Sequence, residues 1–127
     1  MRDCDCHWGC AVIKVSDLWA EVKRVAAEQP DYVYDKPDGN CSYEVGGKPS
    51  CLVGHAMFRL GMPLDLIRRC DRAGAIGHVL DEFGGEFDES GDDKGVYRTL
   101  LVWAQGGQDS GLPWGEAVSE AERSVLS

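Results

Sequence analysis

The sequence predicts a mostly helical α+β domain with one short antiparallel β-hairpin. Apolar residues recur three and four positions apart in several segments that end near glycine or proline, the pattern of amphipathic helices. The turn sequence PDGN at residues 37–40 separates two short runs that contain Tyr and Val. The length of 127 residues and the 43% hydrophobic content are typical of a single domain over residues 1–127.

The first helix is expected to begin at Ser16, whose side chain suits an N-cap, and to end before Pro30. Leu18, Val22 and Val25 share its core-facing side because they recur at helical spacing. Residues 11–15 (AVIKV) are either a strand or the start of this helix.

The hairpin is expected near residues 32–45. Because side chains alternate along a strand, Cys41, Tyr43 and Val45 fall on one face of its second strand. We expect that face to point inward, with Tyr43 and Val45 buried against the next helix.

The next helix is expected to have Ser50 as its N-cap and to end at Gly61. Its apolar stripe consists of Leu52, Val53, Ala56, Met57 and Leu60. At 100° per residue, Cys51 lies opposite the centre of this stripe and His55 beside Cys51. Both are therefore expected on a face turned away from the core.

Further amphipathic helices are expected after Pro63, over residues 76–83, after residue 95 and after Pro113. His78 is expected on the surface. Trp103 and Trp114 are expected to be core or packing residues, because aromatic residues at helical spacing usually are.

The net charge of −9 and the pI near 4.7 disfavour nucleic acid as a ligand, since binding to phosphates requires Lys and Arg. An acidic DNA mimic is an alternative function, but it needs an array of carboxylates, and the predicted helices mix both signs. The sequence has neither a signal-peptide pattern nor a membrane-spanning apolar run, so we expect a cytoplasmic protein without a membrane partner.

Cys4, Cys6, His7 and Cys10 are residue types that bind zinc. Their spacing would strain a site for one ion, so two or three of them joined by Cys41 or Cys51 form an easier site. The alternative is free thiols in a flexible N-terminal segment over residues 1–10, and then the protein has no cofactor.

Cys51 or Cys41 together with His55 suggests a second function, that of a small thiol enzyme. A helix N-terminus and a nearby histidine both favour a thiolate. Against this, the sequence names no group that would orient His55 and no oxyanion hole.

Residues 84–95 form an acidic, glycine-rich loop that we expect to meet a protein partner. Its candidate binding residues are Glu86, Phe87, Asp88, Asp92 and Asp93. Phe87 is either an aromatic anchor for that partner or a plug that folds back onto the core. The spacing of the acids does not complete a calcium-binding loop.

Three segments, EQPDYVY, CSYEVGGKPSCLVGHAMFRLG and QDSGLPWGEAV, give the chain a resemblance to small uncharacterised proteins encoded by actinobacteria and their phages. The resemblance covers roughly residues 28–120. It implies an actinobacterial host, and because that group has no established activity it transfers no catalytic residue.

Taken together, these features favour a small acidic accessory protein, of phage or prophage type, that binds a host protein rather than catalysing a reaction. The sequence does not identify the partner or the oligomeric state. The thiol-enzyme alternative requires a pocket at Cys51 and His55, whereas a binding protein is expected to expose an apolar patch.

Overall fold

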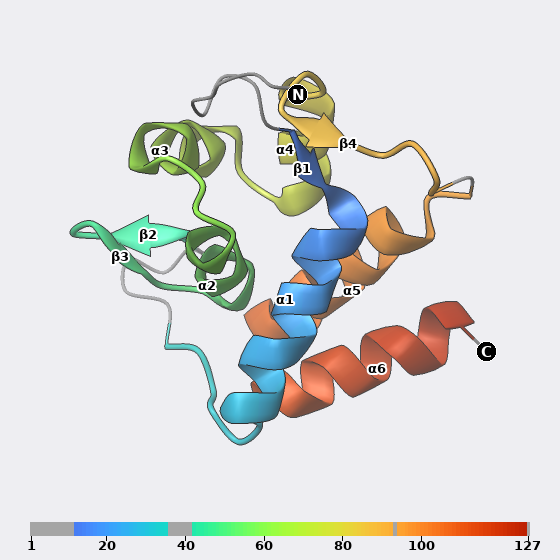
Figure 1. Ribbon diagram of the computed structural model, residues 1–127. Helices are drawn as coiled ribbons and strands as arrows, with labels where there is room; N and C mark the ends of the chain where they lie inside the picture. The colour runs from blue at the N-terminus through green and yellow to red at the C-terminus, as the bar shows by residue number, and fades with distance from the viewer. Residues whose placement is uncertain (1–11, 36–41, 93, 127) are drawn as a thin grey trace.

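The computed structural model describes residues 12–35, 42–92 and 94–126. Within these ranges the fold is mostly helical with a short antiparallel pair of strands, which confirms the predicted α+β class (Figure 1). The helices are α1 (Val15–Glu28), α2 (Leu52–Arg59), α3 (Leu64–Ala73), α4 (Ile76–Glu82), α5 (Val96–Asp109) and α6 (Trp114–Leu126). The strands are β1 (Ile13–Lys14), β2 (Glu44–Val45), β3 (Lys48–Pro49) and β4 (Phe87–Asp88).

Helix α1 crosses the middle of the molecule and contacts α2, α5 and α6 (Figure 1). Helices α5 and α6 are joined by a short connection and pack closely together. Gly107 allows this approach, because a Cβ atom there would lie 3.3 Å from Ala117. No helix in the described ranges is both long enough and apolar enough to cross a membrane.

The antiparallel hairpin lies at residues 44–49, so its predicted position near residues 32–45 was wrong. Glu44 pairs with Pro49 and Val45 with Lys48. Gly46 and Gly47 form the turn with φ angles of 61° and 81°, a conformation that glycine adopts readily. Residues 37–40 and Cys41, which were placed in the predicted hairpin, lie outside the described residues.

The predicted inward face of the hairpin is only half correct. Tyr43 is buried, but Val45, which comes directly before the turn at Gly46 and Gly47, is 45% exposed. Val33, which was assigned to the first predicted strand, forms an isolated antiparallel bridge with Pro113 instead.

Two predicted N-caps also differ from the structure. Helix α1 follows Lys14, so Ser16 lies inside its first turn rather than capping it. The N-cap of α2 is Cys51 and not Ser50, and the Cys51 sulfur accepts a hydrogen bond from the Gly54 N–H at 3.4 Å.

One hydrophobic core joins all six described helices. Trp114, predicted to be a core or packing residue, is buried in it, whereas Trp103, for which the same was predicted, is 47% exposed and is not part of the core. Among the described residues, two buried side chains are polar: Gln105 and Gln108 of α5 are 4% and 1% exposed.

Candidate functional site

The structure buries the proposed nucleophile, Cys51, whose side chain is 0% exposed. The segment before β2 lies alongside it, because the Cys51 N–H donates to the Ser42 carbonyl at 2.9 Å and the Ser50 N–H donates to the Tyr43 carbonyl at 3.1 Å. The expectation that Cys51 lies away from the core was therefore wrong. Helical periodicity assigns a residue to one face of its helix, but it does not show which other segments pack against that face.

His55 lies next to Cys51, as predicted, but it contacts the Cys51 backbone. Its Nδ1 is 2.9 Å from the Cys51 carbonyl oxygen, and because that oxygen can only accept, Nδ1 carries the proton. The ring is half-buried and meets the edge of Trp114 with a centroid separation of 5.1 Å. This arrangement anchors the imidazole to the protein instead of activating a thiol.

A second described thiol, Cys70, is also buried. Burial, aided by the nearby Asp71 carboxyl group, raises its pKa to about 12. At neutral pH Cys70 is therefore a protonated core residue. Cys41, the other candidate nucleophile, lies outside the described residues.

The predicted zinc ligands Cys4, Cys6, His7 and Cys10 all lie outside the described residues, so zinc binding stays a prediction. Within residues 12–35, 42–92 and 94–126, no three His, Cys, Asp or Glu side chains are grouped so that they could hold a metal ion.

In the acidic loop, Phe87 is 4% exposed, so it is the plug and not an exposed anchor. It pairs with Ile13 in the parallel contact between β4 and β1, and the Ile13 N–H donates to the Glu86 carbonyl at 3.0 Å. This pairing with β1 carries the Phe87 ring into the core.

Two predicted binding residues of the loop, Asp88 and Asp92, bond within the protein instead. Asp88 accepts hydrogen bonds from the Ser90 N–H and hydroxyl at 2.9 and 2.6 Å, which lowers the pKa of Asp88. Asp92 accepts from the Tyr97 N–H, a group in the first turn of α5 that has no partner within the helix. Asp93 is outside the described residues.

The outer face of α5 exposes two neighbouring apolar side chains, Val102 (45%) and Trp103 (47%), which we call the α5 ridge. A hollow of about 430 Å³ on one side of the ridge is lined by Val102 and Gly106 and also includes Asp81, Arg98 and Asp109. A second hollow of about 610 Å³ contains Val102, Trp103 and Gly106 together with Leu112, Glu116 and Glu120. The ridge is thus an apolar projection between two depressions.

Arg98 connects the acidic loop to the α5 ridge. It donates two hydrogen bonds to Glu89, at 3.0 and 2.7 Å, and lies 2.9 Å from the carboxylate of Asp81 on α4. The bonds to Glu89 raise the pKa of Arg98, which keeps the guanidinium charged. The loop, α4 and the ridge therefore form one continuous surface.

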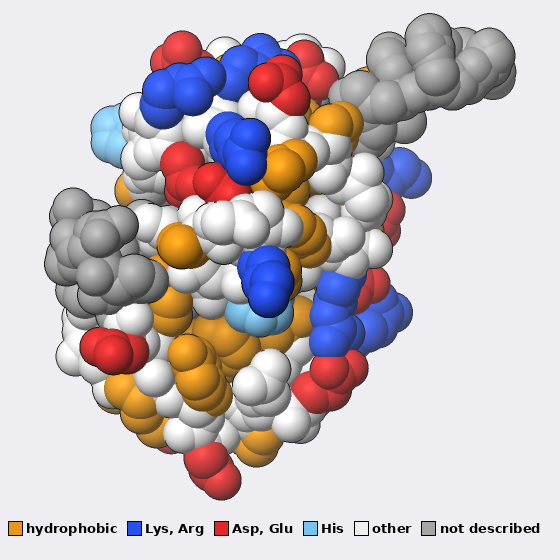
Figure 2. Space-filling model, turned by 90° about the vertical axis from the view of Figure 1, so that its left-hand side faces the viewer, with side chains coloured by type: hydrophobic (Ala, Val, Ile, Leu, Met, Phe, Trp, Pro, Cys, Tyr) orange, Lys and Arg blue, Asp and Glu red, His pale blue; other side chains and the backbone are white. Residues whose placement is uncertain are grey.

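Another exposed apolar patch lies on the side of the molecule that Figure 2 shows, where hydrophobic side chains gather in the lower half of the view. Tyr32 and Val33 contribute to the exposed apolar surface, at 42% and 49%. Tyr32 packs on Trp114 with a centroid separation of 4.5 Å, and its carbonyl accepts the Trp114 N–H at 2.8 Å. Tyr32 therefore already has a structural role as a cover for the buried indole.

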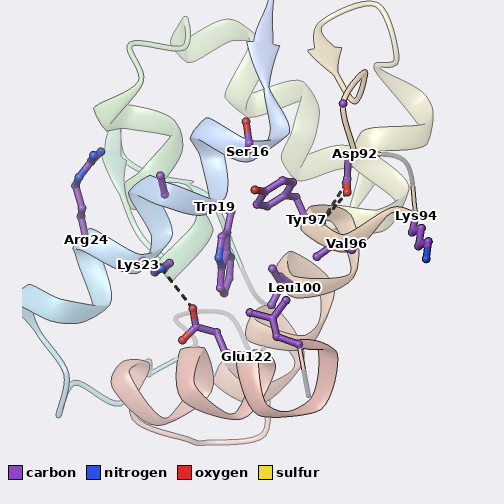
Figure 3. Close-up of a pocket in the computed structure, with 13 residues that line it drawn as sticks. Ser16, Trp19, Lys23, Arg24, Asp92, Lys94, Val96, Tyr97, Leu100 and Glu122 are labelled. Atoms are coloured by element: carbon purple, nitrogen blue, oxygen red, sulfur yellow. Dashed lines mark hydrogen bonds and ion pairs between the residues drawn. The ribbon is translucent and has the colours of Figure 1, made fainter.

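A hollow of about 790 Å³ lies between α1, α5 and α6 (Figure 3). We call it the three-helix hollow. Its apolar wall includes Trp19, Tyr97 and Leu100, and its cations are Lys23, Arg24 and Lys94.

No protein-family model, curated protein or solved structure matches the chain. Its function is therefore inferred from its own residues.

The sequence reasoning missed the exposure of Trp103 and the buried role of Gln105 and Gln108. Both follow from a stricter use of helical angles. Gln105 and Gln108 continue the core stripe of Leu101 and Ala104 at spacings of 3, 4 and 7, and Trp103 lies about 200° from Leu101.

Proposed function

We propose that this protein is a small acidic accessory protein that acts by binding another protein through the α5 ridge. The observation that carries the proposal is the half-exposed Trp103 beside Val102, between two hollows. Tryptophan is highly buried on average in folded proteins, and it is enriched among the residues that dominate binding energy at protein interfaces.

The charges around the ridge favour a partner surface that carries basic side chains. The described linings of the two hollows contain four carboxylates, Asp81, Asp109, Glu116 and Glu120. Arg98 pairs with Asp81, and Arg123 pairs with Glu116 and Glu120, so two arginines oppose four carboxylates and the surface keeps a net negative charge. The chain as a whole has a net charge of −9, which would speed the approach of a basic surface at low salt. An apolar contact with Trp103 would then hold the complex together.

The two alternatives have weaker support. A thiol enzyme needs an accessible thiolate, whereas Cys51 is buried and accepts a backbone hydrogen bond. A DNA mimic needs an unbroken array of carboxylates, whereas Arg123 pairs with both Glu116 and Glu120. The resemblance to proteins of actinobacteria and their phages suggests that the partner is an actinobacterial host factor.

Affinity capture from an actinobacterial lysate, followed by mass spectrometry, tests the proposal. The parent protein is compared with Trp103→Ala, Val102→Ala and the control Val45→Ala. Val45 and Val102 are the same residue type with the same exposed fraction of 45%, but Val45 lies on the hairpin. We expect Trp103→Ala to weaken binding of the captured protein about 30-fold, Val102→Ala to weaken it less, and Val45→Ala to leave it unchanged.

Other outcomes would contradict the ridge as the binding surface. If Val33→Ala loses the captured protein and Val102→Ala keeps it, the partner binds the apolar patch around Tyr32 and Val33. If a folded Cys51→Ala variant loses its effect in a host-growth assay while Trp103→Ala behaves like the parent, the thiol enzyme becomes the better account.

A further inference from the structure

The three-helix hollow combines a fixed apolar wall with positive charge. Trp19 and Leu100 are only 4% and 2% exposed, so they belong to the core and their positions are set by packing. Figure 3 shows the Trp19 indole, the Tyr97 ring and Leu100 arranged around the same space. A volume of about 790 Å³ lies within the range of roughly 300–1,000 Å³ that is usual for sites of small ligands.

The two carboxylates that the described residues contribute to this lining are already engaged within the protein. Both oxygens of Asp92 accept from the Tyr97 N–H, at 3.1 and 3.0 Å, and one accepts from the Arg98 N–H at 3.3 Å. This carboxylate is therefore directed at the first turn of α5, where the helix dipole offsets its charge. Glu122 lies 3.4 Å from the Lys23 ammonium group.

The three cations are spread across the hollow. Lys23 lies on the α1 side facing α6, while Arg24 and Lys94 lie toward its two ends (Figure 3). Arg24 forms an exposed pair with Glu21 on its own helix. The side chains of Lys23 and Glu122 are 51% and 35% exposed, so their ion pair is weak and can be exchanged for another anion.

The geometry points to a binding site for a small amphipathic anion in the three-helix hollow. Its aromatic or aliphatic body would lie against Trp19, Tyr97 and Leu100, and its carboxylate or sulfonate group would contact Lys23. This inference rests on charge and apolar surface together, in a chain that is otherwise strongly acidic. It is independent of the proposed protein partner, because neither Val102 nor Trp103 lines this hollow.

A pair of fluorescent probes tests the site on the full chain. The first is 8-anilinonaphthalene-1-sulfonate, an aromatic anion, and the second is N-phenyl-1-naphthylamine, which has the same rings without the sulfonate. We expect saturable binding of one equivalent of the anion and at least fivefold weaker binding of the neutral probe, because only the anion gains an ion contact.

Charge variants then identify the contact. Lys23→Gln is expected to weaken binding of the anionic probe about fivefold, whereas Glu122→Gln is expected to strengthen it about threefold by freeing Lys23. If the ion pair between Lys23 and Glu122 only stabilised the fold, Glu122→Gln would not bind the anionic probe more tightly. Lys48→Gln is the matched control, because it removes the same charge from the exposed hairpin.

Three results would overturn the inference. The first is that the protein binds the two probes with equal affinity. The second is that the parent and Lys23→Gln bind the anionic probe equally well. The third is that the protein self-associates and that this self-association competes with the anionic probe. The last result would assign the hollow to a second copy of the chain. Circular dichroism of each variant ensures that binding is compared between folded proteins.

Discussion

The side-chain oxygen of Gln108 lies 2.7 Å from the backbone nitrogen of Leu52, the first residue of α2. The same oxygen accepts a hydrogen bond from the Trp114 indole at 3.1 Å. One turn earlier on α5, Gln105 accepts from the N–H of Ile76, the first residue of α4, also at 2.7 Å. Helix α5 therefore supplies acceptors for the otherwise unpaired N–H groups of two other helices.

Replacing Gln108 by Leu should destabilise the fold. It would leave the Leu52 N–H and the Trp114 indole N–H buried without this acceptor, and we expect the free energy of unfolding to fall by about 3 kcal/mol. Urea unfolding measures the loss. The control is Gln29→Leu, at an exposed position, with an expected change of about 0.5 kcal/mol or less. Equal stability of the two variants would contradict the capping role of Gln108.

Alanine substitutions at two helical glycines should have opposite effects. In Gly54→Ala the added Cβ would lie 2.1 Å from the Tyr43 carbonyl oxygen, a backbone atom that cannot rotate away, so we expect a loss of about 3 kcal/mol or more. In Gly106→Ala the Cβ meets nothing within 4 Å, and the higher helix propensity of alanine should add about 1 kcal/mol. Thermal unfolding of both variants shows whether Gly54→Ala lowers the stability and Gly106→Ala raises it. A Gly54→Ala protein as stable as the parent would disprove the close approach of α2 to Tyr43.

The helices could be predicted from the sequence because each has an apolar stripe that local spacing defines. The hairpin was misplaced because two turn sequences compete within one stretch, and Gly46–Gly47 forms the two-residue turn that joins β2 to β3. The burial of Cys51 depends on the segment at Ser42 and Tyr43, and that of Phe87 on β1, and neither partner is close in the sequence. Local periodicity carries no information about such contacts.

The candidate sites were less predictable than the fold. The exposure of Trp103 follows from its angle relative to Leu101, so the α5 ridge is encoded locally. The three-helix hollow, by contrast, brings Lys23 of α1 and Glu122 of α6 to the same space as Tyr97 of α5. Only the packing of the three helices defines it.

Cys51 and Cys70 should resist a thiol reagent in the folded protein. A variant that keeps these two residues, with Cys4, Cys6, Cys10 and Cys41 replaced by Ser, allows both thiols to be followed with Ellman's reagent at pH 8. Burial hinders both, and the raised pKa of Cys70, about 12, alone lowers its thiolate population roughly a thousandfold. We expect rapid reaction only after unfolding in urea. Fast labelling of Cys51 in the native variant, located by peptide mass spectrometry, would revive the thiol-enzyme function.

Asp71 provides a test of pH-dependent stability. Its carboxylate accepts the N–H groups of Tyr43 at 2.6 Å and Glu44 at 3.4 Å, but burial outweighs these bonds and raises the pKa of Asp71. A folded-state pKa above the unfolded value means that the folded protein takes up the proton first on acidification. The contribution of this group to stability is therefore largest at pH values below its unfolded pKa and declines as the pH rises through the folded pKa.

Asp71→Asn isolates this effect, because the amide keeps an oxygen acceptor for the Tyr43 N–H and does not titrate between pH 4 and 7. We expect the free energy of unfolding of the parent, relative to Asp71→Asn, to increase as the pH falls from 7 to 4. Urea unfolding of both proteins at the two pH values measures this difference in the free energy of unfolding. The contributions of all other titrating groups cancel, because both proteins contain them. Asp71→Ala, which removes both acceptors, should be less stable than Asp71→Asn by about 1–2 kcal/mol at either pH. A parent that loses stability relative to Asp71→Asn on acidification would mean that the two backbone hydrogen bonds outweigh burial and that the pKa of Asp71 is lowered.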